Sequence, residues 1–341
     1  MKATLFSTIS NLSPTPASVH QDDEMVIEKQ TRRRGKKGND RSRLDGSVKE
    51  GSNGASGYKP HLTPLISSAD ETSQLWYEWG RNVPGRDDTS CDLDPSLTTL
   101  QKSLLAKKYR SLADEIFRVE ISLTVSGSSS SGTKARSDER WVENTMKKGT
   151  LKDRIAATSV LVSTDPIHKL SALDSLLGMA GCADSGQSNS RVAQMAAEAL
   201  EDLFLNTLLP PGRKLLTLEQ RPLALYELSS TKTSTKTLSP RVLLLWRFEE
   251  ILKERYQSFL SGYLAATLRD GMDLNKTFAL RIAGTMLRST PEGEAQLLTM
   301  MVNKLGDPGR KIAASAGHEL RRVLDEHENM QEIAAREVRS L

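Results

Sequence analysis

The residues best suited to catalysis lie toward the C-terminal end of the chain. His318 and Glu319 begin the zinc-protease pattern, in which a second histidine follows one helical turn later. Arg322 occupies the position of that second histidine, so the set of zinc ligands is incomplete. A zinc-protease site is therefore not expected.

A cluster of acidic residues and a histidine follows directly, at positions Asp325, Glu326, His327 and Glu328. Consecutive residues at a helix end point in different directions, so these side chains cannot converge on one ion. A solvated helix terminus explains the cluster better than metal ligation. The sequence also has no phosphate-binding loop, dinucleotide-binding motif or nucleophile elbow. We therefore predict no catalytic residue, no metal, no cofactor and no small-molecule substrate.

Two groups of basic residues could contact a nucleic acid. The first lies near the N-terminus and consists of Arg32, Arg33, Arg34, Lys36, Lys37, Arg41 and Arg43. It is typical of a nuclear or nucleolar targeting signal that also contacts RNA, and the alternative is a solvated charged tail. The second group is Arg310, Lys311, Arg321 and Arg322. It could bind rRNA phosphates or a partner protein, and the alternative is a solvated helix face.

The placement of charge limits how much nucleic acid the chain could follow. The chain has 47 Lys and Arg, 43 Asp and Glu, and a formal charge of +4. Residues 1–68 hold eleven of the basic and seven of the acidic residues, so the remainder is neutral. A groove that follows many phosphates would leave a basic excess on the folded part. We therefore expect a protein-binding scaffold with local nucleic-acid contacts.

Cysteine content and hydropathy indicate an intracellular protein. Cys91 and Cys182 are far apart and form no paired motif, which fits a reducing compartment. No apolar run is long enough for a secretory signal or a membrane span. We expect no membrane partner.

The elements that would position the second basic group are two helices over residues 296–330. Apolar residues recur at helical spacing in each half, and Gly306 and the pair Asp307-Pro308 separate the halves. Asp307 is expected to cap the second helix. Two short amphipathic helices at a tight corner are typical of one HEAT or armadillo repeat. The alternative is an ordinary helical hairpin in a globular all-α domain.

The rest of the chain predicts an all-α fold, an armadillo/HEAT-like solenoid preceded by a disordered N-terminal tail. Residues 1–68 form the basic tail. Residues 69–138 hold an aromatic segment, a helix over 97–121 and a Ser-rich linker. Residues 139–341 hold the helical repeats, including a long helix over 241–269. The expected structural anchors are Trp76, Tyr77, Trp79, Trp246, Asp307 and Pro308, and the three N-terminal aromatics could anchor in the chain itself or in a partner.

Four blocks of the sequence, in order, resemble the CCAAT-binding factor family and its nucleolar complex-associated members. A shorter upstream motif, WYE at 76–78, also resembles that group. The blocks are KKGTLKDRIAATSVLVSTDPIHKLSALDSLLGMA (147–180), ALEDLFLNTLLPPGRKLLTLEQRPL (199–223), LLLWRFEEILKERYQSFL (243–260) and LLTMMVNKLGDPGRKIAASAGHELRRVLDEHENM (297–330).

The resemblance implies a non-enzymatic scaffold in the nucleus and nucleolus that assembles the large ribosomal subunit. It also implies an armadillo-like fold, a heterodimer with a related nucleolar complex-associated protein, and contact with pre-ribosomal large-subunit particles and their rRNA. A transcription cofactor at CCAAT elements is the alternative, and a transport adaptor is a weaker one. The sequence departs from the family in a small polar loop at 181–190 and an apparent insertion at 228–240. It also stops at Leu341, where the family's repeats continue, so we expect a C-terminally truncated form.

Overall fold

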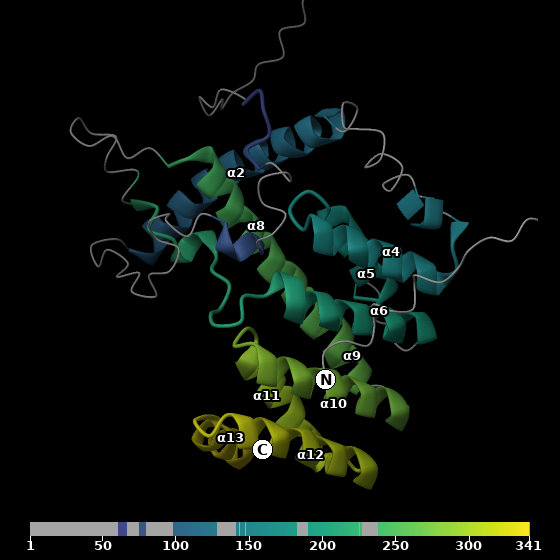
Figure 1. Cartoon of the computed structure of the whole chain (residues 1–341). Coiled ribbons are helices and arrows are strands. Elements are labelled where there is room, and N and C mark those ends of the chain that lie inside the picture. Colours follow the sequence, from purple (N-terminus) through teal and green to yellow (C-terminus); the bar gives the residue numbers. More distant parts are fainter. Residues whose placement is uncertain are drawn as a thin grey trace, which may run out of the picture. The chain divides into compact units, whose positions relative to one another are not determined.

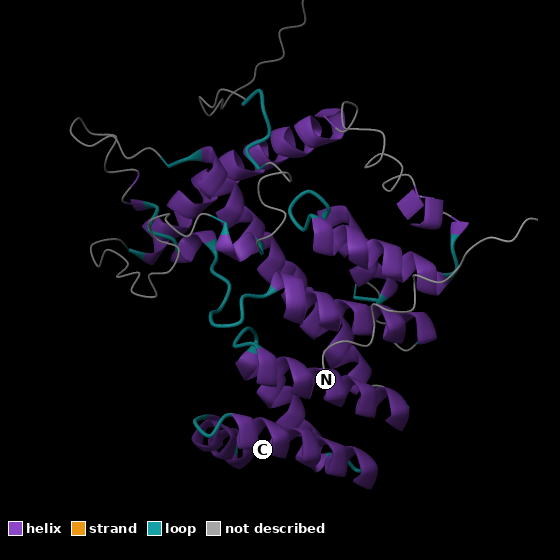
Figure 2. Cartoon of the chain, in the orientation of Figure 1, coloured by secondary structure: helices purple, strands orange, loops and turns teal. Residues whose placement is uncertain are grey.

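A computed structural model describes residues 61–66, 75–79, 98–127, 141–142, 144–146, 148–182, 190–224, 226, 238–269 and 271–340. Over these ranges every regular element is a helix and none is a strand (Figures 1 and 2). The prediction of an all-α fold is confirmed. Residues 1–60 and 67–68 of the predicted N-terminal tail, most of the Ser-rich linker and most of the loops at 181–190 and 228–240 lie outside the described residues.

The longer α-helices are α2 (Thr99–Gly127), α4 (Leu151–Thr164), α5 (Leu170–Met179), α6 (Arg191–Leu203), α8 (Pro240–Ser258), α10 (Asp273–Ser289), α11 (Glu294–Asn303), α12 (Arg310–Glu326) and α13 (Met330–Arg339). The shorter elements are the 3-10 turns η1 (Trp76–Glu78), η3 (Leu218–Gln220) and η5 (Lys304–Gly306), the π-helical turns η2 (Phe204–Leu208) and η4 (Phe259–Leu264), and the short helix α9 (Ala265–Leu268). No helix among these is long and apolar enough to cross a membrane.

Local sequence signals set several helix starts. Thr150 and Asp153 form a reciprocal capping box at the start of α4. The hydroxyl of Ser190 accepts a hydrogen bond from the backbone N–H of Ala193 at the start of α6. Pro240 occupies the first position of α8, where its missing N–H costs nothing. These starts therefore follow from residue type alone.

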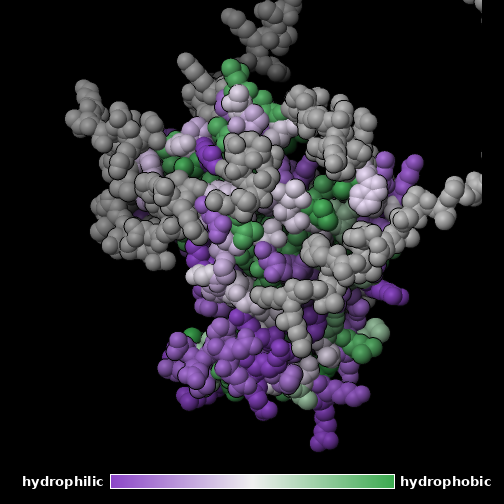
Figure 3. All heavy atoms as spheres, in the orientation of Figure 1, coloured by the Kyte–Doolittle hydropathy of each residue, from purple (hydrophilic) through white to green (hydrophobic). Residues whose placement is uncertain are grey.

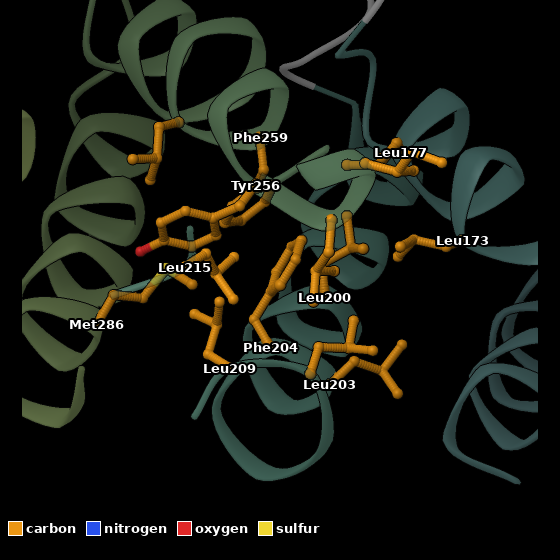
Figure 4. Packing of buried hydrophobic residues seen from close by; sticks show 14 of the residues in the cluster. Leu173, Leu177, Leu200, Leu203, Phe204, Leu209, Leu215, Tyr256, Phe259 and Met286 are labelled. Atoms are coloured by element: carbon orange, nitrogen blue, oxygen red, sulfur yellow. The ribbon is translucent and has the colours of Figure 1, made fainter. Parts of the chain in front are cut away.

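The helices pack against elements both near and distant in sequence and bury one apolar cluster. α4 contacts α5 and α6, α8 contacts α2, and α10 contacts both α11 and α12. Aromatic rings from η2, α8 and η4 meet in the cluster (Figure 4). The ring centroid of Phe204 lies 5.1 Å from that of Tyr256 in an edge-to-face contact and 5.7 Å from that of Phe259. This cluster fixes η2, which directly follows α6, against α8 and η4.

Two predicted elements differ from the structure. The helix predicted over 241–269 is divided into α8, η4 and α9, since its middle turn widens to π geometry. Leu100 and Leu104, two of the apolar residues whose spacing predicts the helix over 97–121, are 71% and 60% exposed. The buried residues of α2 begin further along at Ala106, so about its first two turns extend beyond the core.

The corner between α11 and α12 also differs in detail. α11 ends at Asn303, a 3-10 turn runs to Gly306, and Gly309 is the residue that precedes α12. The carboxylate of Asp307 accepts a hydrogen bond from the backbone N–H of Gly309 at 3.0 Å. The predicted cap at Asp307 is therefore wrong, because its side chain shapes the turn before the helix instead of capping the helix.

Candidate nucleic-acid interface on α12

α12 forms because its apolar residues recur at helical spacing on one face. Ile312, Ala316, Leu320 and Val323 are buried, and α12 packs mainly against α10. The opposite face is exposed, and Figure 3 shows hydrophilic residues gathered at the bottom of the molecule, where Figure 1 places α12 and α13. The helix therefore has one face in the core and one available for a ligand.

The second basic group of the sequence lies on the exposed face of α12. Arg310 and Lys311 stand in its first turn, and Arg321 and Arg322 stand about three turns later, or about 16 Å along the axis. Exposed Ala314 and His318 lie between the two pairs on the same face. We call Arg310, Lys311, Arg321 and Arg322 the α12 basic stripe.

The cations of the α12 basic stripe are largely uncompensated. Over the described residues, Arg310, Lys311 and Arg321 have no ion-pair partner. Arg322 lies 3.4 Å from a carboxylate oxygen of Glu319, but that oxygen is already held by Arg288 at 2.9 Å. The stripe could therefore bind phosphates without first breaking a strong internal ion pair.

The stripe rests on a buried ion pair between α10 and α12. The guanidinium of Arg288 and the carboxylate of Glu319 are both nearly inaccessible to solvent. Gly284 permits this approach, since a Cβ there would lie 2.7 Å from Oε2 of Glu319. Glu326 lies 3.4 Å from Arg288, and a ring nitrogen of His327 lies 2.8 Å from the Arg288 carbonyl oxygen. Glu326 and His327 therefore stabilise the junction of α10 and α12.

No group of three or more His, Cys, Asp or Glu side chains within the described ranges is arranged to hold a metal ion. This includes Asp325–Glu328, where Asp325 and Glu328 are exposed.

Asp307 ties the corner before α12 to α10. Hydrogen bonds from the Gly309 backbone N–H and from Lys304 hold the pKa of Asp307 below its usual value. Lys276 of α10 lies 3.5 Å from the same carboxylate. Pro308 is exposed beside it. The first turn of α12, which carries Arg310 and Lys311, is thereby fixed relative to α10.

The aromatic residues predicted as anchors contact the chain itself. The indole N–H of Trp76 donates to the Leu208 carbonyl at 2.9 Å, and its ring centroid lies 5.0 Å from that of Phe248. Trp79 is buried and Tyr77 is partly buried. Trp246 is also buried, and the guanidinium of Arg221 lies over its ring at 5.1 Å.

Sequence reasoning missed a set of buried carboxylates that hold residues 213–221, which we call the strap. The strap has only the short turn η3 as regular structure, so most of its backbone N–H groups need other partners. Glu292, Glu249 and Glu250 accept hydrogen bonds from the backbone N–H groups of Leu215, Leu216 and Leu218 at 2.6, 2.9 and 3.2 Å, respectively. The signal in the sequence is the adjacent pair Glu249 and Glu250 inside an otherwise apolar helix face.

Each of these carboxylates is also paired with basic side chains. Glu249 binds Arg213 and Arg221, Glu250 binds Arg110 and Arg247, and Glu292 binds Lys253. Burial would raise the pKa of Glu250, but hydrogen bonds from Arg110 and the Leu218 N–H, with the charges of both arginines, lower it overall. The lowered pKa favours the ionised form of Glu250, and the paired acids join α2, the strap and α8.

The N-terminal basic group, Arg32 to Arg43, lies outside the described residues. Its role as a targeting signal stays a prediction.

Comparison with known proteins identifies relatives of this chain. No family model matches the chain. It is 37% identical over 205 residues to nucleolar complex protein 1 of Drosophila melanogaster, which covers 60% of this chain and 17% of that protein. It is 33% identical over 237 residues to CCAAT/enhancer-binding protein zeta of Homo sapiens, and the match covers 70% of this chain and 22% of that protein. It is 32% identical over 206 residues to ribosome biogenesis protein NOC1 of Chaetomium thermophilum, and the match covers 58% of this chain and 19% of that protein.

The chain is therefore similar to proteins of the CCAAT-binding factor family. The resemblance carried by the four sequence blocks is thereby confirmed. The chain spans about a fifth of the length of these curated relatives (17%, 22% and 19%).

Proposed function

We propose that this chain is a member of the CCAAT-binding factor family and a non-enzymatic scaffold in ribosome biogenesis that acts in the nucleus and nucleolus. It assembles large-subunit pre-ribosomal particles through protein contacts and local rRNA contacts. The observation that carries the proposal is the similarity to proteins named nucleolar complex protein 1 and ribosome biogenesis protein NOC1.

The fold supports a scaffold of the armadillo/HEAT type. Consecutive helices contact one another in α4 with α5 and α6, and in α10 with α11 and α12. Stacked helical pairs expose extended faces to partners while each pair buries its own apolar stripe. One face of this scaffold binds a related nucleolar complex-associated protein in a heterodimer.

The α12 basic stripe supplies the proposed contact with rRNA phosphates. Its two pairs of cations are exposed, and the acidic residues from Asp325 onward limit the stripe at its C-terminal end. A short stripe suits a few phosphates better than a long groove, in agreement with the neutral charge of the chain beyond residue 68.

The test is gradient sedimentation of the tagged chain from cells, with and without RNase. We expect co-migration with large-subunit precursors and their assembly proteins, and loss of that co-migration after RNase. Sedimentation as a free small species in both conditions would contradict the proposal for this chain.

A second measurement addresses the stripe itself. Replacement of Arg310, Lys311, Arg321 and Arg322 by Ala should lower the affinity of the purified chain for an rRNA fragment. The slope of log affinity against log salt should become less steep by about 0.7 for each single-stranded phosphate that the variant no longer neutralises. The control replaces Lys107, Arg118, Lys152 and Arg154 by Ala, which removes the same charge from exposed positions on α2 and α4. An equal reduction of affinity in the two variants would exclude a specific site on α12.

A second candidate function is that of a transcription cofactor at CCAAT elements. The names of the human and mouse relatives, CCAAT/enhancer-binding protein zeta, favour it. It requires discrimination between a CCAAT duplex and a scrambled duplex at physiological salt. Equal, strongly salt-dependent binding to both duplexes would count against it.

A further inference from the structure

Residues His61–Ile66 form a short segment that docks on α2 without regular secondary structure of their own. They precede the aromatic anchor at Trp76 and are separated from it by residues outside the described ranges. The contact is centred on one carboxylate, that of Glu120, which is 1% exposed. This docking site belongs to neither the α12 basic stripe nor the strap.

Glu120 binds mainly the backbone of this segment. Its Oε2 accepts a hydrogen bond from the Leu65 N–H at 2.9 Å, and its Oε1 accepts one from the Ile66 N–H at 3.0 Å. The Nε2 atom of His61 lies 2.9 Å from Oε2. One buried carboxylate thus holds two successive backbone N–H groups and one imidazole.

Apolar side chains complete the contact: Ile66 is buried, and Leu65 is partly buried against the core. Ile66 is 2% exposed and belongs to the core cluster, whereas Leu62 is 90% exposed. Backbone hydrogen bonds combined with a buried side chain at a fixed position are a general mode of peptide recognition. The backbone bonds supply affinity for a peptide in this bent conformation, and His61 and Ile66 supply its sequence preference.

His168 prepares the receptor side of this site. Its Nδ1 lies 2.8 Å from Asp165 and its Nε2 lies 3.3 Å from Oε1 of Glu120. Both ring nitrogens therefore face carboxylates, and both can donate only when the imidazole is protonated. The positive ring keeps Glu120 ionised and oriented toward the peptide backbone.

The tether makes docking within the chain favourable even if the site is intrinsically weak. Residues 67–74 connect the segment to η1, and a chain of that length reaches at most about 30 Å. A short tether holds its end at an effective concentration on the order of millimolar. A free peptide must therefore compete with the tethered segment.

We propose that Glu120, oriented by His168, forms a peptide-docking site that His61–Ile66 occupies in cis. The site takes a bent peptide with histidine at its first position and isoleucine at its sixth. The same peptide binds in trans when the tethered segment is displaced.

The test uses the full chain and a fluorescein-labelled peptide of residues 58–68. Ile66→Asp removes the buried anchor and should release the tethered segment, because an ionised carboxylate is costly in the core. We expect the labelled peptide to bind the Ile66→Asp chain at least about tenfold more tightly than the unaltered chain, measured by fluorescence anisotropy. Leu62→Asp is the matched control, and it should bind the peptide as weakly as the unaltered chain does.

Two outcomes would overturn the proposal. One is equal binding of the peptide to the Ile66→Asp and Leu62→Asp chains while both keep the helical circular dichroism of the unaltered chain. The other comes from hydrogen exchange, which does not depend on the Ile66→Asp chain folding. Glu120→Gln should speed exchange of the Leu65 and Ile66 amides at least about tenfold while leaving α5 and α6 protected, and unchanged exchange would exclude the docking site.

Discussion

At the scale of single residues, His168 is held as a cation inside the fold. Burial alone would lower its pKa, but hydrogen bonds and negative charge from Asp165 and Glu120 outweigh burial and raise the pKa to about 9. Glu120 shows the converse. Burial would raise its pKa, but bonds from His168, His61 and the two backbone N–H groups lower the pKa overall.

These pKa values predict how stability depends on pH. An unfolded histidine titrates near 6.5, so between that pH and about 9 the folded chain binds one more proton than the unfolded chain. The contribution of His168 is complete below pH 6.5 and is lost as the pH rises through about 9, with an upper value of ~3 kcal/mol. The contribution of Glu120 is lost instead as the pH falls through its lowered pKa.

Urea unfolding at pH 7 and pH 9.5 measures this effect. His168→Asn should remove most of the loss of unfolding free energy between the two pH values. His318→Asn, on the exposed face of α12, should leave that loss unchanged. An unaltered pH dependence in His168→Asn would show that another group is responsible.

At the scale of elements, the approach of α10 to α12 depends on a missing side chain. Gly284→Ala would normally favour a helix, but here the new Cβ lies 2.7 Å from Oε2 and 3.1 Å from Cβ of Glu319. Glu319 cannot move without weakening its buried ion pair with Arg288. We expect a loss of about 1–3 kcal/mol in the free energy of unfolding.

The control is Gly178→Ala on α5, where a Cβ would meet nothing within 4 Å. That change should be neutral or stabilising by up to about 1 kcal/mol, since alanine is the better helix former. Relative to the unaltered chain, the melting temperature should therefore fall in Gly284→Ala and stay the same or rise in Gly178→Ala. Equal melts would show that α10 and α12 can separate at little cost.

The strap gives a second prediction about elements. Glu249→Gln removes the negative charge that pairs with the guanidinium groups of Arg221 and Arg213, and it weakens the bond to the Leu216 N–H. We expect a loss of about 3 kcal/mol or more, as for other broken buried ion pairs. Glu254→Gln, on the same helix but 53% exposed, should cost less than about 0.5 kcal/mol. Denaturant unfolding of both variants makes the comparison.

The spacing of apolar residues could predict where most helices lie. It could not predict the contacts between residues that are distant in sequence. The spacing of apolar residues predicted the two helices over 296–330, which include the helix α12 that carries the α12 basic stripe. It could not show that Glu319 is already engaged, because Arg288 is distant in sequence. It also could not show that Leu100 is exposed, since an amphipathic pattern does not show where a helix leaves the core. The strap was missed because carboxylates that bind backbone N–H groups leave no periodic signal.

At the scale of the whole molecule, basic charge is concentrated at the N-terminal end. Residues 1–68 account for the entire formal charge of +4. If the group from Arg32 to Arg43 is a targeting signal, it should act independently of the helical part.

Alanine replacement of Arg32, Arg33, Arg34, Lys36 and Lys37 in a fluorescently tagged chain tests this prediction. The nucleolar fraction should fall several-fold, while RNA binding through the α12 basic stripe should persist in the purified chain. The four-residue α12 variant should show the reverse, with import retained and RNA affinity reduced. Unchanged nucleolar accumulation in the first variant would assign targeting to another part of the chain.

The strap has a consequence for how the family diverges. Its backbone N–H groups, which every residue except proline provides, hold it to Glu249, Glu250 and Glu292. Exposed strap positions such as Lys214 and Glu219 can therefore be substituted during evolution without weakening the backbone hydrogen bonds that hold the strap. The three acids have no such freedom, because each also neutralises basic side chains. Distant relatives should be recognised by the adjacent glutamates of α8 more readily than by the segment those glutamates hold.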